Sequence, residues 1–160
     1  MSAIIKEGAP VVKRFSKAKL HYFGGYGRAE PIRMLLAHAK IPYEDITYKH
    51  GSVILNRRKE QGLFEFGQLP VLQMKGPRYY SQSISTLRFL GIKHKYYPPN
   101  MKDAQKAWLI DSTIDSYSDT LDAYYAAVFS SDAAAKPALI NKYFGTTLPH
   151  WLGCLNNRLV

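Results

Sequence analysis

The segment most suggestive of a ligand site is the glycine-rich loop Gly24-Gly25-Tyr26-Gly27. It lies between a predicted strand and a predicted helix, where helix N-termini often bind phosphate. The loop does not complete the GxGxxG pattern of dinucleotide-binding proteins, because Glu30 occupies the position of the third glycine. No Gly-Lys-Ser or Gly-Lys-Thr motif is present either. A tight turn between strand and helix is therefore the better interpretation.

Metal binding and nucleophilic catalysis find little support in the residue pattern. The five histidines have no metal-ligand spacing, and the single cysteine, Cys154, excludes an internal disulfide and a Cys-based zinc site. We therefore expect no metal. Cys154 stands among apolar residues, so we expect a packed side chain and not a reactive thiol. The low cysteine count fits a reducing compartment.

Basic residues are concentrated in the first part of the chain. The net charge is +4 over residues 1–20, +7 over 21–95 and −1 over 96–160, which suggests two structural units. The clusters 57–59 and 93–95, the latter followed by two tyrosines, could bind single-stranded nucleic acid. They fall on a short predicted helix and a predicted linker and not on a known nucleic-acid module, so a solvated surface is preferred.

The elements that position these groups begin as a β-α-β unit, with a parallel strand pair and a right-handed crossover. Alternation and aromatic residues predict a strand over 19–24, and helical spacing of apolar residues predicts a helix over 29–40. Residues 43–48 are interpreted as a second strand. A short helix is expected over 52–62, with Ser52 as its cap. A hairpin over 70–74 and 78–81 and a helix from 81 or 82 to 90 complete this part.

The remaining chain is predicted to be helical. Residues 92–99 are interpreted as a linker, followed by a long helix from about 100–103 to 130 and another from 137 to 155. The expected divisions are an extension over 1–18, an α/β domain over 19–91, a linker over 92–100 and a helical domain over 101–160. We expect no transmembrane segment and no secretory leader, and residues 1–18 only weakly resemble a mitochondrial leader.

Three segments carry a resemblance to one family: residues 19–48, 66–73 and 81–90, which contain GRAEPIR, GQLPVL and QS at a helix start. Together they resemble cytosolic glutathione transferases, closest to the sigma-type branch. The resemblance implies an α/β plus all-α fold, in which a thioredoxin-like domain is followed by a helical domain. It also implies a homodimer, with glutathione as co-substrate, that acts in detoxification.

The same resemblance implies roles for individual residues. Tyr22 matches the tyrosine whose hydroxyl stabilises the glutathione thiolate, and Leu69-Pro70 matches the cis-proline segment that pairs with the cysteinyl part of glutathione. The γ-glutamyl end would be held by Gln82 and Ser83. Arg28 and Glu30 would support the site from beside it, and Arg57 would hold the glycyl carboxylate. Asp119 would reach the γ-glutamyl amine bound by the partner subunit.

Two departures from the family pattern bear on these assignments. No tryptophan occurs between residues 43 and 66 to help hold the glycyl carboxylate, which leaves Arg57, Arg58 and Lys59 as the candidates for that role. The helical part looks shortened, because no Ser/Thr-x-x-Asp capping box follows Trp151. The chain would then be a fragment or a naturally short protein, and its exposed apolar helix faces would need covering.

Two functional hypotheses follow. The first is an enzyme that conjugates the glutathione thiolate to small apolar electrophiles. The alternative is a catalytically weak or inactive glutathione-transferase-like subunit of a larger mitochondrial or cytoskeletal assembly. The expected location is cytoplasmic, with mitochondrial or cytoskeleton-associated as alternatives. Nothing in the sequence identifies the electrophile, and nucleic acid is not an expected partner.

Overall fold

The computed structural model describes residues 17–159. The predicted extension over residues 1–18 therefore lies almost wholly outside the described residues. The chain divides after His94 into two compact units, and each is described by itself.

The first unit has the β-α-β-α-β-β-α order that the sequence predicts. Its elements are β1 (Ala18–Phe23), α1 (Glu30–His38), β2 (Tyr43–Tyr48), α2 (Val53–Glu60), β3 (Val71–Gln73), β4 (Tyr79–Tyr80) and α3 (Ser83–Lys93). The predicted strand over 43–48 and the predicted cap of α2 are confirmed, since the Ser52 hydroxyl accepts a hydrogen bond from the Leu55 N–H at 3.3 Å. Helix α3 runs through Lys93, so the first residues of the predicted linker are helical.

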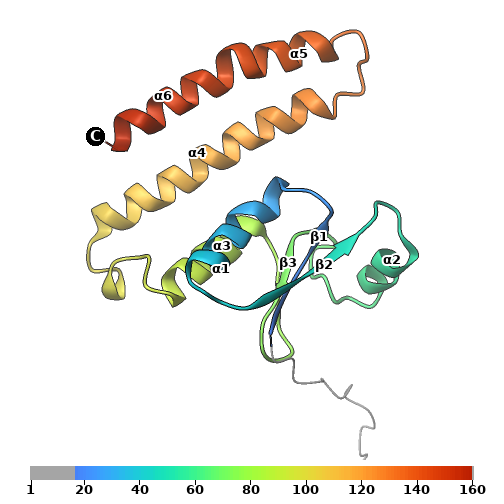
Figure 1. Cartoon of the computed structure of the whole chain (residues 1–160), viewed down its shortest axis with the longest axis vertical. Coiled ribbons are helices and arrows are strands. Elements are labelled where there is room, and N and C mark those ends of the chain that lie inside the picture. The colour runs from blue at the N-terminus through green and yellow to red at the C-terminus, as the bar shows by residue number, and fades with distance from the viewer. Residues whose placement is uncertain (1–16, 160) are drawn as a thin grey trace, which may run out of the picture. The chain divides into compact units, whose positions relative to one another are not determined.

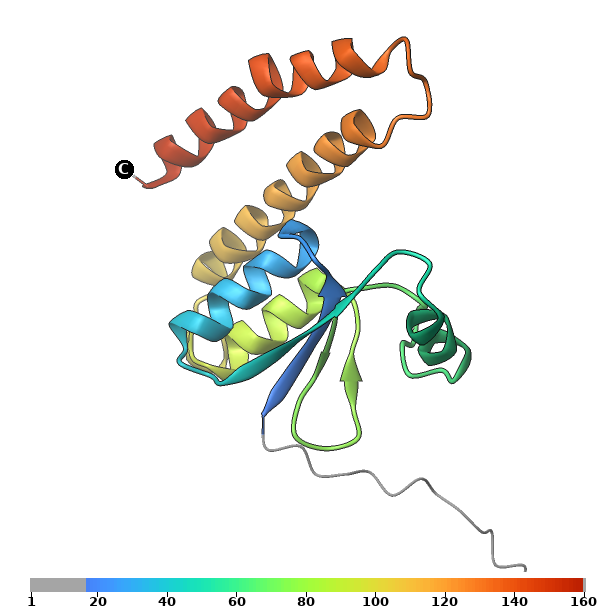
Figure 2. The same cartoon turned by 45° about the vertical axis from the view of Figure 1, so that its right-hand side comes forward.

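The four strands form one mixed sheet in the order β2-β1-β3-β4 (Figure 1). Strand β1 pairs in parallel with β2, as the crossover through α1 requires, and antiparallel with β3. Helices α1 and α3 cover one face of the sheet and α2 lies on the other (Figure 2). The C-terminal end of β1 therefore meets the start of α1 at one edge of this unit.

Alternation along β1 divides its side chains between two apolar cores. Leu20 and Tyr22 pack with α1 and α3, in a core that includes Ile32 and Leu90. His21 points to the opposite face, where its ring lies against the rings of Tyr48, Phe64 and Tyr79. The two-residue period of a strand thus places Tyr22 and His21 in different environments.

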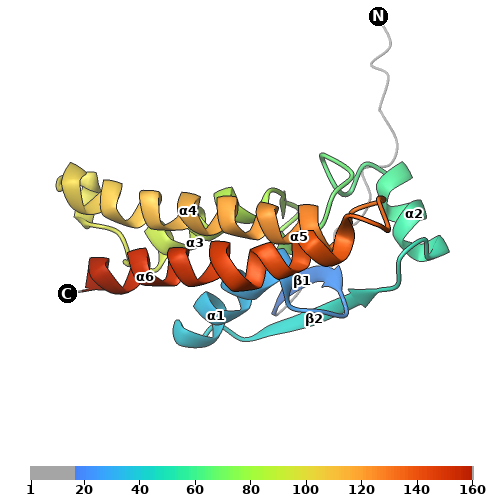
Figure 3. The same cartoon turned by 90° about the horizontal axis from the view of Figure 1, so that it is seen from above.

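The second unit is a helical hairpin in the described residues. Helix α4 (Ala104–Val128) begins after Asp103, whose carboxylate accepts from the Lys106 N–H at 2.9 Å. Helix α5 (Lys136–Lys142), a π-helical turn (Tyr143–Thr147) and α6 (Leu148–Leu159) then follow without a break, where the sequence predicted one helix. The α5–α6 rod lies beside α4 (Figure 3).

Few side chains of the described hairpin are buried: Ala107, Thr120, Ala127 and Tyr143. Trp151 donates to the Ser116 hydroxyl at 3.3 Å, and Arg158 donates to Ser112 and Thr113 at 2.9 Å, so polar contacts join α6 to α4. The prediction that Cys154 is packed is wrong: its side chain is exposed, and it lines an open cavity that Ser112 and Ser116 of α4 also line. In the described part of the chain, no helix is both long and apolar enough to span a bilayer.

Candidate functional site

The turn between β1 and α1 is held by one arginine. The Arg33 guanidinium donates to the Gly25 carbonyl at 2.9 Å, to the Glu30 carboxylate at 3.0 Å and to the Asp45 carboxylate at 3.1 Å. Burial lowers the pKa of Arg33, but the two carboxylates outweigh it and the net shift is upward. The glycine-rich segment is thus a tight turn tied to α1 and β2.

This turn brings Tyr22 to the start of the following helical segment. The Tyr22 hydroxyl accepts a hydrogen bond from the backbone N–H of Arg28 at 3.1 Å, and the Arg33 guanidinium carbon lies 5.9 Å from the centre of the tyrosine ring. Because the oxygen accepts from Arg28, its own hydrogen is available to donate to a further acceptor. The geometry therefore suits a buried phenol that donates to a ligand.

A cavity of about 500 Å³ lies beside this turn in the first unit, within the size range of small-molecule sites. Five of the predicted site residues line it: Arg28, Leu69, Pro70, Gln82 and Ser83. Tyr22 is not among the lining residues, but its hydroxyl contacts Arg28, which is. Arg57 does not line the cavity, and Asp119 lies in α4 of the second unit.

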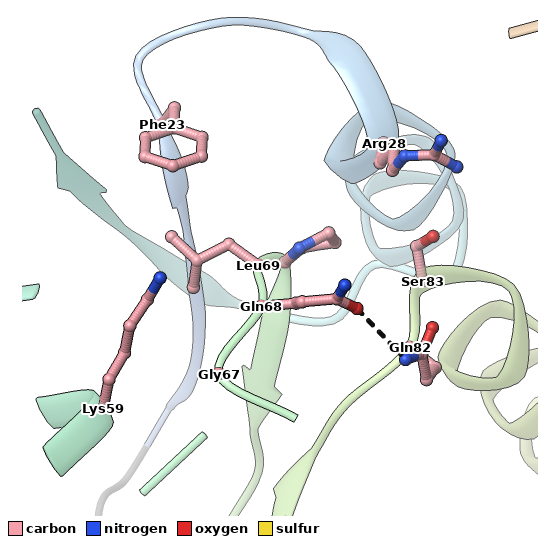
Figure 4. Close-up of a pocket in the computed structure, with 9 residues that line it drawn as sticks. Phe23, Arg28, Lys59, Gly67, Gln68, Leu69, Gln82 and Ser83 are labelled. Atoms are coloured by element: carbon pink, nitrogen blue, oxygen red, sulfur yellow. Dashed lines mark hydrogen bonds between the residues drawn. The ribbon is translucent and has the colours of Figure 1, made fainter. Parts of the chain in front are cut away.

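The cavity wall also contains residues that the sequence interpretation did not single out or did not choose. Phe23, Gly67 and Gln68 line it, and Lys59 approaches from the end of α2 (Figure 4). Gln68 lies within the FGQLP segment and Phe23 directly follows Tyr22, so both could have been found from their neighbours. Lys59 was one of three open alternatives, whereas Phe23 carried no chemical signal of its own.

Two backbone features shape the floor of the cavity. The Leu69–Pro70 peptide bond is cis, as the resemblance implies, and Leu69 lies outside the strand ladder because β3 begins at Val71. Gln82, which immediately precedes α3, has a φ of 66°, and its side-chain amide donates to the Gln68 amide oxygen at 3.3 Å (Figure 4). Such a backbone conformation is unfavourable for a residue with a side chain and is often found at ligand sites.

The charges around the cavity favour an anionic ligand. Arg28 and Lys59 line it, none of the acidic residues in 17–159 does, and Figure 4 shows these two cations on opposite sides of Leu69. Ser83 opens α3, where the first N–H groups of a helix have no partner within the helix. A helix N-terminus and a hydroxyl together suit a carboxylate. The cavity thus fits an extended molecule with a negative group at each end.

Metal ligands are not clustered in this region. Among residues 17–159, no group of three or more His, Cys, Asp or Glu side chains is placed so that it could hold a metal ion.

We expect Arg33→Met to lower the free energy of unfolding by about 1–2 kcal/mol, because two partly exposed carboxylates and one carbonyl lose their donor. Urea unfolding would measure the loss. Arg57→Met, at an exposed position, is the matched control and should change the stability by no more than about 0.5 kcal/mol. Equal losses in both variants would show that Arg33 does not hold the turn.

Comparisons with known proteins give a consistent result. No protein-family model matches the chain. Glutathione S-transferase A3 of Homo sapiens is 33% identical over 103 residues, which are 64% of this chain and 44% of that protein. Prostaglandin synthase D of Nilaparvata lugens has a TM-score of 0.75 at 26% identity, covering 89% of this chain and 68% of that one. The sigma class glutathione transferase of Fasciola hepatica has a TM-score of 0.67 at 28% identity, covering 86% and 63%.

These likenesses confirm the predicted fold class, a thioredoxin-like α/β unit followed by a helical unit. The chain spans about half the length of the curated relatives it matches.

Proposed function

This chain belongs to the cytosolic glutathione transferase family, and on that premise we propose that it binds glutathione and conjugates the thiol to small apolar electrophiles. The observation that carries the proposal is the cavity between the Tyr22–Arg28 contact and the N-terminus of α3. Its cationic walls and its length along Leu69 match a tripeptide with a carboxylate at both ends.

In the proposed binding mode, glutathione lies across Leu69 like an added strand. Ser83 and the free N–H groups at the start of α3 hold the γ-glutamyl carboxylate, with Gln82 beside them. Lys59 holds the glycyl carboxylate in preference to Arg57, because Lys59 lines the cavity and Arg57 does not. A homodimer would let Asp119 of one protomer reach the γ-glutamyl amine in the other, as the family resemblance implies.

The proposed chemistry depends on the Tyr22 hydroxyl. A free thiol has a pKa near 8.5, so only a few per cent is thiolate at neutral pH. Tyr22 would donate its hydroxyl hydrogen to the sulfur and stabilise the thiolate. The backbone N–H of Arg28 donates a hydrogen bond to the tyrosine oxygen. The thiolate then forms a bond to an electrophilic carbon, and a leaving group departs with its electron pair or an acceptor atom is protonated.

Retention on immobilised glutathione, with elution by free glutathione, tests the binding half of the proposal. Conjugation of an aryl halide tests the chemical half. Retention without conjugation would favour the alternative of a weak or inactive structural subunit, and failure of both would reject glutathione as the ligand. A sigma-type assignment and a cytoplasmic location are further proposals, supported by the Fasciola hepatica neighbour and by the family's usual setting.

We expect Ser83→Ala to weaken glutathione binding at least several-fold, because it removes a hydroxyl donor to a carboxylate. Titration calorimetry would measure the dissociation constant, and the turnover rate at saturating glutathione should change little. Ser85→Ala is the control: Ser85 lies in the same helix and is exposed, but does not line the cavity. An unchanged constant in Ser83→Ala would mean that the γ-glutamyl end is held elsewhere.

A further inference from the structure

A second cavity lies in the first unit, on the side of the sheet that faces α2. Its volume is about 210 Å³, and it shares no lining residue with the proposed glutathione site. We call it the His21 cavity. It is lined by Lys19, His21, Ile46, Arg58, Gln61, Leu63, Gln73 and Tyr79. Two of these residues are cations and none is acidic, so the lining is rich in hydrogen-bond donors.

His21 is the most unusual group in this lining, because it is only 1% exposed. Its Nδ1 lies 2.8 Å from the Tyr48 hydroxyl and 3.4 Å from a guanidinium nitrogen of Arg58. Arg58 can only donate and the Tyr48 hydroxyl can do so, so the tautomer that satisfies both contacts has Nδ1 as acceptor and the ring proton on Nε2. That Nε2 atom is buried and has no hydrogen-bond partner.

The ring is neutral at neutral pH. Burial and then the charge of Arg58 lower the pKa of His21 to about 4. The Gln73 side chain approaches the ring and offsets part of this lowering of the pKa, yet it makes no bond of good geometry with Nε2. His21 therefore presents a buried N–H donor, and buried donors in native proteins are nearly always satisfied.

Arg58 adds a positive charge that has no carboxylate contact within residues 17–159. Its described contacts are His21 and the face of the Tyr48 ring, 5.7 Å from the guanidinium carbon, and neither is a carboxylate. Lys19, the other cation, forms an ion pair with Glu44 at 3.3 Å. A water molecule could accept from Nε2, but it would not neutralise a partly buried guanidinium.

We propose that the His21 cavity binds a small oxyanion, a phosphate or a carboxylate, held by the Arg58 guanidinium and the Nε2–H of His21. The volume admits such an ion and excludes a tripeptide of glutathione's size. The Gln61 and Gln73 amides also line the cavity and can supply further donors. The site is separate from the proposed catalytic cavity, so occupancy of the two can be measured independently.

The test is a titration followed by the ¹⁵N and ¹H signals of the His21 ring. Sodium phosphate and sodium acetate form two arms, each compared with sodium chloride at the same ionic strength. S-methylglutathione is added at high concentration in a parallel series, so that anion binding in the first cavity is blocked. We expect a saturable change in the His21 signals with phosphate, acetate or both, and the arm that saturates identifies the oxyanion.

Variants assign the binding to Arg58. Arg58→Gln should raise the dissociation constant at least tenfold, and Arg58→Lys should recover part of the loss. Arg57→Gln removes the same charge from the neighbouring exposed position and should leave the constant within about twofold of its original value. If Arg58→Gln does not fold, Arg58→Lys alone should still raise the constant measurably.

The proposal is overturned if the His21 signals respond to phosphate and acetate no more than to chloride, which would leave water as the occupant. It is equally overturned if Arg57→Gln and Arg58→Gln weaken binding alike. The His21 signals report this cavity directly, so failure of glutathione retention would reject the proposed function without affecting this test.

Discussion

Replacing Tyr22 with phenylalanine is expected to slow glutathione conjugation by tenfold to a hundredfold while leaving glutathione affinity nearly unchanged. The phenol hydroxyl is the donor that would lower the pKa of the bound thiol. Tyr22→Phe removes only this hydroxyl group. Each tenfold loss corresponds to about 1.4 kcal/mol of thiolate and transition-state stabilisation. The ring stays in the core that Tyr22 shares with Leu20 and Ile32, so the fold should be retained.

Initial rates with an aryl halide, measured from pH 6 to 9, distinguish this role from a structural one. If Tyr22 acts on the sulfur, the rate of the variant should recover as pH approaches the pKa of a free thiol, near 8.5. Tyr26→Phe is the control, because Tyr26 lies in the turn that follows β1 and is 79% exposed. Equal rates for the original protein and Tyr22→Phe across the whole pH range would remove Tyr22 from the mechanism.

Local patterns were sufficient to predict most of the first unit. The strand predicted over 43–48 matches β2, and the apolar spacing of Ile32, Leu35 and Leu36 predicted α1 within two residues. Ser52 was predicted as a cap, because its hydroxyl can reach an N–H three residues later, and it does. These features depend on interactions between residues close in sequence, so they can be predicted from the sequence alone.

To choose among Arg57, Arg58 and Lys59 as the residue for the glycyl carboxylate, one must know which side of helix α2 faces the cavity. Leu55 is buried, so Arg57, two residues on, points to the opposite side of the helix and is exposed. Lys59 is four residues beyond Leu55 and returns to the inner side, where it lines the first cavity. The periodicity of such a short, mostly polar helix was too weak to fix that phase beforehand.

The environment of His21 could not have been predicted from its neighbours in sequence. Its partners are Tyr48 and Arg58, which are 27 and 37 residues away. The pairing of β1 with β2 brings Tyr48 near, and the packing of α2 beside the sheet brings Arg58 near. The exposed position of Cys154 escaped prediction for a similar reason: apolar neighbours in sequence do not show which side of a helix is covered. Long-range packing decides both cases.

The second large effect expected is a loss of stability on acidification, centred on His21. In the unfolded chain its pKa would be near 6.5, whereas in the folded protein it is lowered to about 4, chiefly by burial. Between these two values the unfolded state binds a proton that the folded state does not bind. The free energy of unfolding should therefore fall as pH drops through this interval, by about 3 kcal/mol between pH 7 and pH 4 from this group alone.

Urea unfolding at several pH values in chloride buffers measures this loss, with phosphate and acetate left out so that no oxyanion can raise the pKa of His21. Carboxylates also titrate below pH 5, so the informative quantity is the difference in pH dependence between the original protein and His21→Gln. That variant should be less stable at pH 7 but should lose about 3 kcal/mol less on going to pH 4. His50→Gln, at an exposed position, should keep the original pH dependence. If His21→Gln does not fold, the His21 ring signals in the original protein give the pKa directly, and a value near 6.5 would show that the buried ring carries no such penalty.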